Sequence, residues 1–181
     1  MGASLPEQMT DWLPEPAIRV THRVPSTASA ADLWQAASEL TLAGSPVLGR
    51  LVQWRIPGTA RGLSFDRLLR EPPFLVLADG EHSLLSGLVG RIWTLRRDYP
   101  ELSDPEQFRA FSERGSARVA IGVWAEPDPR GGALRMEARV EALGVQGQVG
   151  VAAVRPLVRG FQGLIGSEAL RAAARRAESG G

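Results

Sequence analysis

The two histidines are the side chains of this chain that ordinarily titrate closest to neutral pH, so they are the first candidates for chemistry. His22 and His82 stand far apart in the sequence, and Glu81 immediately precedes the second of them. An imidazole can accept and return a proton during catalysis, and a neighbouring carboxylate can assist it. The catalytic candidates are therefore His22, Glu81 and His82.

Each candidate also has a simpler interpretation. His22 is expected on the inward face of a strand, where it is either a hydrogen-bonded core residue or a group that bonds a ligand or acts as a general base. Glu81 and His82 fall between two strand candidates, so they form an exposed loop pair or, if the loop covers a pocket entrance, an acid–base pair. The sequence contains no G-x-S-x-G nucleophile motif and no glycine-rich phosphate loop. Whether the protein is an enzyme stays open.

Neither a metal nor another cofactor is expected. The chain has no cysteine and only two histidines, and isolated histidines without a carboxylate at ligand spacing make a poor metal site.

Composition points to one soluble domain. The 181 residues carry 21 basic and 20 acidic side chains, a balance that offers no electrostatic argument for binding nucleic acid. No segment has the pattern of a signal peptide or the ~18 apolar residues of a membrane span. We expect a cytoplasmic protein without stable membrane insertion.

Hydrophobic periodicity predicts a mixture of strands and helices. Residues 1–16 are expected to form a tail or extended arm, and the alternation over 17–24 predicts a half-buried strand that Pro25 should end. A helix is expected from a serine or threonine cap through Glu39. The segment 47–56 is ambiguous, and further strand candidates are 63–69, 74–78 and 87–95. Residues 106–111 fit one helical turn or a short strand.

The last third of the chain has the clearest pattern. Residues 118–124 and 134–143 alternate as two strands joined by a turn-rich hairpin. On the second strand a row of charged side chains is expected to face water: Arg135, Glu137, Arg139 and Glu141. The segment 148–177 predicts a long helix, bent near its start by Pro156, with an apolar inner stripe that includes Val158, Phe161 and Ile165.

Three segments carry a resemblance to a known family. They are Val24-Pro25-Ser26-Thr27-Ala28 followed by Leu33-Trp34, the strand Gly87-Leu88-Val89-Gly90-Arg91-Ile92-Trp93, and a helix pattern with Phe161, Leu164-Ile165, Leu170 and Ala177-Glu178. Together they resemble an uncharacterised bacterial branch of the START-like superfamily, also called SRPBCC or the birch-pollen-allergen fold. The resemblance covers 17–178. It implies an α+β helix-grip domain in which a curved antiparallel sheet of six or seven strands wraps around a long C-terminal helix, with two short helices after the first strand.

The resemblance also implies an interior cavity for an apolar molecule. The expected ligand contacts are inward apolar residues and tryptophans: Trp54, Trp93, Val119, Ile121, Met136, Val158, Phe161 and Ile165. Binding or carriage of a small hydrophobic or amphipathic molecule, similar to a lipid or polyketide, is the first functional hypothesis. The second is a cyclase-like or dehydratase-like enzyme with His22 or the Glu81-His82 pair as proton shuttle. The third is a protein-interaction module that forms a homodimer through the terminal helix.

Overall fold

The structure is a computed structural model of the chain, and it describes residues 4–41, 43, 62–94 and 99–179, with the backbone alone for 157–167. In chain order the described elements are α1 (Leu5–Trp12), β1 (Ile18–Ser26), α2 (Ala30–Ser38), α4 (Phe65–Arg70), β2 (Leu75–Gly80), β3 (Ser83–Gly90), α5 (Pro105–Ala110), β4 (Ser116–Asp128), β5 (Gly131–Leu143) and α6 (Gly144–Ser179).

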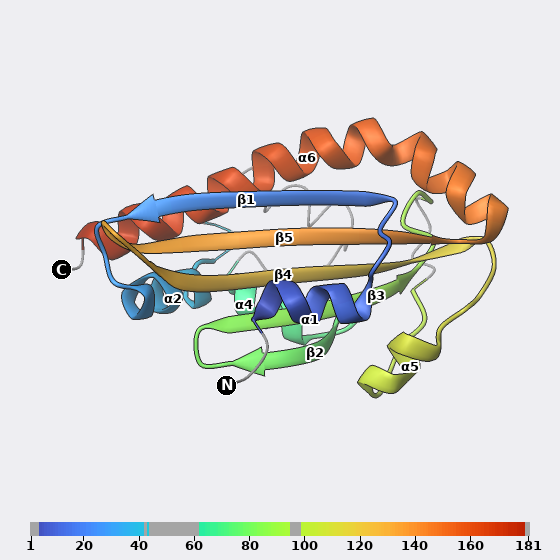
Figure 1. Cartoon of the computed structure of the whole chain (residues 1–181), viewed down its shortest axis with the longest axis horizontal. Coiled ribbons are helices and arrows are strands. Elements are labelled where there is room, and N and C mark those ends of the chain that lie inside the picture. The colour runs from blue at the N-terminus through green and yellow to red at the C-terminus, as the bar shows by residue number, and fades with distance from the viewer. Residues whose placement is uncertain (1–3, 42, 44–61, 95–98, 180–181) are drawn as a thin grey trace.

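The described strands form one antiparallel sheet in the order β1-β5-β4-β3-β2 (Figure 1). The long β4–β5 hairpin is its centre, with Ser116 paired to Leu143 at one end and Asp128 to Gly131 at the other. The first strand pairs with the last, from Ile18 opposite Val140 to Ser26 opposite Gly132. The α+β class is confirmed, but five strands are described where six or seven were predicted.

The helix α6 follows β5 directly and runs beside β1 in the same direction (Figure 1). It is longer than the predicted helix and is continuous through Pro156, so the proline does not interrupt it. The ribbon arches over the sheet (Figure 1), as expected where a proline removes a helical hydrogen bond. The sheet face toward α6 is called the inner face below, and α2 and α4 pack on the same side.

The outer face is covered by α1 and α5, which lie on the other side of the sheet (Figure 1). Leu5 and Met9 of α1 and Phe108 of α5 join a buried cluster with outer-face strand residues such as Leu85 and Trp124. Residues 5–12 are therefore a docked helix, which corrects the prediction of a tail or extended arm.

The docked α1 also corrects the prediction for the charged row of β5. Glu137 and Arg139 were expected to face water, but their side chains are only 2% and 3% exposed. Arg139 donates from Nε to Glu137 Oε1 at 2.6 Å and from Nη1 to Thr10 Oγ1 and the Leu13 carbonyl, each at 3.1 Å. Because Thr10 lies on α1 and Leu13 directly follows it, these bonds tie the helix to the sheet.

Three other local predictions differ from the structure. Pro25 does not end β1 but lies inside it, paired with Ala133, which is tolerated because β1 is an edge strand. The predicted strand 63–69 is largely the helix α4, capped by Ser64, whose side chain accepts from the Arg67 amide. The strand predicted over 87–95 is β3, which begins earlier and ends at Gly90.

Candidate functional site

The inner face of the sheet is built almost entirely from apolar side chains because the strands alternate. On β4 it presents Val119, Ile121, Val123 and Ala125, and on β5 it presents Leu134, Met136, Ala138 and Val140. Strand pairing sets these side chains side by side in rows across the sheet. One such row runs His22, Met136, Val123 and Leu84 from β1 to β3.

Burial along the inner face is uneven. Val119 and Val123 on the central strand β4 are buried, whereas Ile121 between them is only half-buried. Val20 and His22 on β1 are half-buried as well. Because β4 has a neighbour on each side, the exposure of Ile121 does not arise at a sheet edge. The described residues therefore cover the inner face incompletely at this level.

Two contact regions between α6 and the sheet lie on either side of this level. Near its start, α6 contributes Val151 to a cluster with Ile18 and Val119. Further on, it contributes Leu170 and Ala173 to a cluster with Met136 and Val123 and with residues of α2 and α4. Ile121 touches both clusters, so it lies between the two places where described side chains of α6 meet the sheet.

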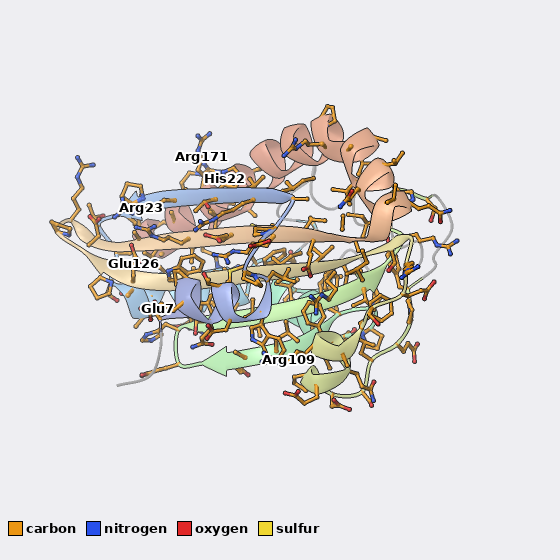
Figure 2. The ribbon with its side chains drawn as sticks, turned by 45° about the vertical axis from the view of Figure 1, so that its right-hand side comes forward. Glu7, His22, Arg23, Arg109, Glu126 and Arg171 are labelled. Atoms are coloured by element: carbon orange, nitrogen blue, oxygen red, sulfur yellow. The ribbon has the colours of Figure 1, made fainter. Side chains whose placement is uncertain are left out.

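Two polar contacts tie α6 to the ends of β1. Arg155 Nη2 donates to the Ala17 carbonyl at 2.8 Å, and Ser26 Oγ donates to Glu178 Oε1 at 2.6 Å. The two ties span about 30 Å of strand and about 35 Å of helix, so the two elements run alongside each other. His22 lies on β1 roughly halfway between the ties, beside α6 (Figure 2).

His22 has a buried nitrogen without a hydrogen bond. Its Nε2 atom is inaccessible to solvent and has no hydrogen-bond partner within the part of the chain that the structure describes. Its inner-face neighbours are apolar: Val20 and Val24 along β1, and Met136 across the strand pair. The structure therefore places His22 on the inward face as predicted, but not as a hydrogen-bonded core histidine.

Glu168 of α6 is a polar group that sequence reasoning missed. Its Oε2 atom is also buried and unpaired among the described residues. Helical residues turn by about 100° each, so Glu168 points away from Leu170 and Ala173, which face the sheet. Among the described residues, no hydrogen bond joins its Oε2 atom to His22. A carboxylate directly before the apolar residues Ala169 and Leu170 was the signal that could have drawn attention to it.

Glu81 and His82 form the turn between β2 and β3, with Glu81 exposed and His82 half-buried. The His82 carbonyl accepts from the Ala125 amide at 2.9 Å. Strand order puts two strands between β1 and β3, so the two histidines are separated by about 14 Å across the sheet. The structure does not bring His22 and the Glu81-His82 pair into one site.

The tryptophan expected in the cavity wall lies at one end of the inner face. Trp93 follows β3 in a turn, is half-buried, and packs with the cluster of Ile18 and Val119. Its ring lies against Gly150 of α6, where an added Cβ would come within 2.3 Å of Trp93 Cε2. Trp93 does not share a face with Val89, because β3 ends at Gly90 and Val89 packs in the outer-face cluster.

The described residues therefore bring four predicted ligand contacts to the inner side of the sheet: Trp93, Val119, Ile121 and Met136. Trp54 and the side chains of Val158, Phe161 and Ile165 lie outside the described residues.

A small groove opens between α2 and α4 onto the same face. Trp34 and Phe65 line it, and Leu84 and Val123 of the inner face contribute to its wall. Its cavity volume is about 10 Å³, which is enough for about one water molecule. This groove is too small to hold an organic ligand.

The buried charges of the outer face stabilise the fold and are remote from the inner face. Burial alone would raise the pKa of Glu137, but hydrogen bonds from Arg19 and Arg139 outweigh it and hold that pKa below its ordinary value. Within the described ranges, no three His, Cys, Asp or Glu side chains gather as a metal site. None of the described helices is long and apolar enough to cross a membrane.

The first strand lies beside the last, two described helices lie between β1 and β2, and a long terminal helix packs on the inner face. These features define an α+β helix-grip domain, and its fold is of the START-like, birch-pollen-allergen kind. The fold assignment rests on the strand order and on the packing of α6.

Solved structures that are similar to the chain include two with the following measures of likeness. The crystal structure of protein MLL2253 from Mesorhizobium loti is 15% identical, with 87% of this chain and 98% of that chain covered and a TM-score of 0.40. The crystal structure of Ara h 8.0201 is 11% identical, with 90% and 98% covered and a TM-score of 0.37. No protein-family model and no curated protein sequence matches the chain.

Proposed function

We propose that this protein binds a small hydrophobic or amphipathic molecule, similar to a lipid or a polyketide, between the inner face of the sheet and α6. The observation that carries the proposal is the partial exposure of Ile121 on an apolar face, between the two regions where described side chains of α6 meet the sheet. An apolar surface left uncovered inside a fold is where an apolar ligand gains most from leaving water.

The proposed ligand contacts are Trp93, Val119, Ile121 and Met136, together with Trp54, Val158, Phe161 and Ile165. A ligand that removed about 200 Å² of apolar surface from water would gain about 5 kcal/mol before the costs of association.

Binding is favoured over the cyclase-like alternative because of the surroundings of His22. A proton shuttle needs a partner that holds its imidazole in one tautomer. Among the described residues, none bonds His22 Nε2, and Glu81 and His82 lie elsewhere on the sheet. We therefore propose binding or carriage in the cytoplasm without chemistry.

A homodimer is a secondary proposal. Val145 and Val149, near the start of α6, are 76% and 66% exposed, and such apolar side chains on one helix edge suit contact with a second copy.

The test of binding uses Nile red, a neutral apolar dye, titrated into the purified protein, together with native mass spectrometry for a co-purified molecule. Replacing Ile121 with tryptophan would fill the proposed space, so Ile121→Trp should weaken Nile red binding at least about tenfold, equivalent to about 1.4 kcal/mol. Val145→Trp is the matched control, because it adds the same ring at an exposed position of α6, and it should bind the dye as the wild type does.

The proposal is wrong if the wild type neither binds Nile red nor carries a co-purified molecule. It is also wrong if Ile121→Trp folds normally and binds the dye as tightly as the Val145→Trp control.

A further inference from the structure

We infer that His22 Nε2 holds the polar end of the bound molecule, and that this end is a neutral hydrogen-bonding group: a hydroxyl, a phenol or a carbonyl. This inference rests on the proposed function, and it adds the orientation and the chemical class of the ligand.

The first observation is the unpaired nitrogen. Leaving a buried polar atom without a hydrogen bond costs about 1–3 kcal/mol, so such atoms are rare in folded proteins. His22 Nε2 is buried in this way among the described residues. A ligand group that bonded it would recover that free energy, and an apolar ligand would not.

The second observation is that the other described polar side chains of the inner face are already bonded. Ser86 on β3 donates to the Leu69 carbonyl at 2.7 Å. Ser26 at the end of β1 donates to Glu178 at 2.6 Å, and it stands about 13 Å along the strand from His22. On β4 and β5 the described inner-face side chains are apolar. Among the described strand residues of the inner face, His22 is therefore the one with a buried side-chain atom left unbonded.

The third observation concerns charge, and it favours a neutral head group. A buried carboxylate or phosphate needs a cation beside it. The arginines of β4 and β5 lie on the outer face and pair there: Arg118 with Glu141, Arg135 with Glu126, and Arg139 with Glu137. On α6, Arg155 bonds the Ala17 carbonyl and Arg176 bonds Glu39. Arg171 and Arg175 of α6 are exposed to solvent, so among the described residues no arginine is buried beside His22 Nε2 to neutralise an anion there.

The fourth observation is the setting of the imidazole. Val24 belongs to the cluster with Leu170 and Ala173, and Val20 to the cluster with Val151. His22 lies between them on β1 and, like Ile121, is half-buried. A molecule whose apolar body covered Ile121 would extend across the sheet toward His22, so its polar end would meet Nε2.

The test compares matched probes that differ only in the head group. The chain probes are 1-decanol, undecane and decanoate, and the ring probes are 2-naphthol, 2-methylnaphthalene and 2-naphthoate. Dissociation constants are measured by NMR titration of ¹⁵N-labelled protein. The wild type should bind 1-decanol or 2-naphthol about tenfold more tightly than the methyl analogue, as expected for pairing a buried polar atom. The His22 Nε2 resonance should shift on adding the alcohol.

Three variants assign the preference to this nitrogen. In His22→Leu the dissociation constants of the alcohol and of its methyl analogue should agree within about twofold. The alcohol should bind more weakly than to the wild type, and the methyl analogue should bind as before. His22→Gln should keep part of it, because its amide nitrogen reaches close to the position of Nε2. His82→Leu removes the other histidine, on the β2–β3 turn, and should change nothing. If His22→Leu does not fold, two other results test the role of His22: the alcohol preference of His22→Gln, and the shift of the wild-type Nε2 resonance on adding the alcohol.

The outcomes separate this inference from the proposed function. If no probe binds the wild type, the proposed function fails and the inference fails with it. If the probes bind but the alcohol preference is absent, or survives in His22→Leu, the ligand site stands and the role of His22 is refuted. Tighter binding of decanoate than of 1-decanol would refute the neutral head group.

Discussion

The buried ion pair under α1 offers the sharpest test of the structure. In Arg139→Met the side chain keeps most of its volume but loses its charge and its bonds to Glu137, Thr10 and the Leu13 carbonyl. Glu137, 2% exposed, would keep Arg19, whose side chain is 56% exposed and whose Nη2 lies 3.0 Å from Glu137 Oε2.

The expected loss follows from the burial of both partners. Removing one partner of a buried pair typically costs about 3–5 kcal/mol, because the other charge stays buried without compensation. Glu137 would still accept from Arg19 and from Thr21 Oγ1 at 3.3 Å, so we expect a loss at the low end of this range, about 3 kcal/mol, for Arg139→Met. Removing both charges, in Glu137→Leu with Arg139→Met, should cost less than the single change, because no uncompensated charge remains.

The assay is urea unfolding followed by tryptophan fluorescence, with the free energy of unfolding extrapolated to water. Arg135→Met is the matched control, because Arg135 lies on the outer face of the same strand, is 32% exposed and pairs with Glu126. It should cost under about 1 kcal/mol. If Arg139→Met costs no more than Arg135→Met, or if the double variant is less stable than the single one, α1 does not bury this pair and the account is wrong.

Two further predictions concern helix packing and pH. Gly150→Ala would set a Cβ within 2.3 Å of the Trp93 ring, so thermal unfolding should show a loss of about 1–3 kcal/mol despite the better helix propensity of alanine. Gly62→Ala, with nothing within 4 Å of its Cβ, should leave the stability unchanged. If the two variants lose the same stability, Gly150 does not pack against Trp93. The pKa of Glu137 lies below its ordinary 4.5 in the folded protein, so its contribution to stability is complete above about pH 4.5 and is lost as the pH falls through the lower folded value. Across this pH range, the free energy of unfolding measured with urea should fall more steeply for the wild type than for Glu137→Gln. If it falls equally in both, the hydrogen bonds from Arg19 and Arg139 do not lower the pKa of Glu137.

The sheet was predictable where the alternation was strict. The patterns over 118–124 and 134–143 lie within β4 and β5, and they correctly placed Val119, Ile121 and Met136 on one face. The helix α4 was missed although its signals were present: Ser64 caps it, and Asp66 and Arg70 pair at helical spacing. Short segments are ambiguous because a few apolar residues fit either period.

The candidate site was predictable in position but not in its chemistry. Alternation along β1 sets His22 on the same face as Val20 and Val24, which the sequence alone indicated. That Nε2 is buried without a described partner depends on α6 and on the neighbouring strands, which are distant in sequence. Hydrogen-bond satisfaction is a property of the packed environment, so a one-dimensional pattern does not reveal it.

The sequence by itself determined which side chains share a face, because successive strand residues point to opposite sides of a sheet whatever packs on it. Only the tertiary structure decided what covers each face. The alternation of charged residues along β5 predicts a solvent-facing row, yet α1 covers Glu137 and Arg139. Arg139 donates hydrogen bonds to Thr10 Oγ1 and to the Leu13 carbonyl, which hold α1 over the pair. The inner face looks like ordinary core, yet Ile121 and His22 stay partly uncovered between the two regions where α6 meets the sheet. Cover depends on contacts between segments far apart in the chain, and local periodicity carries no information about them.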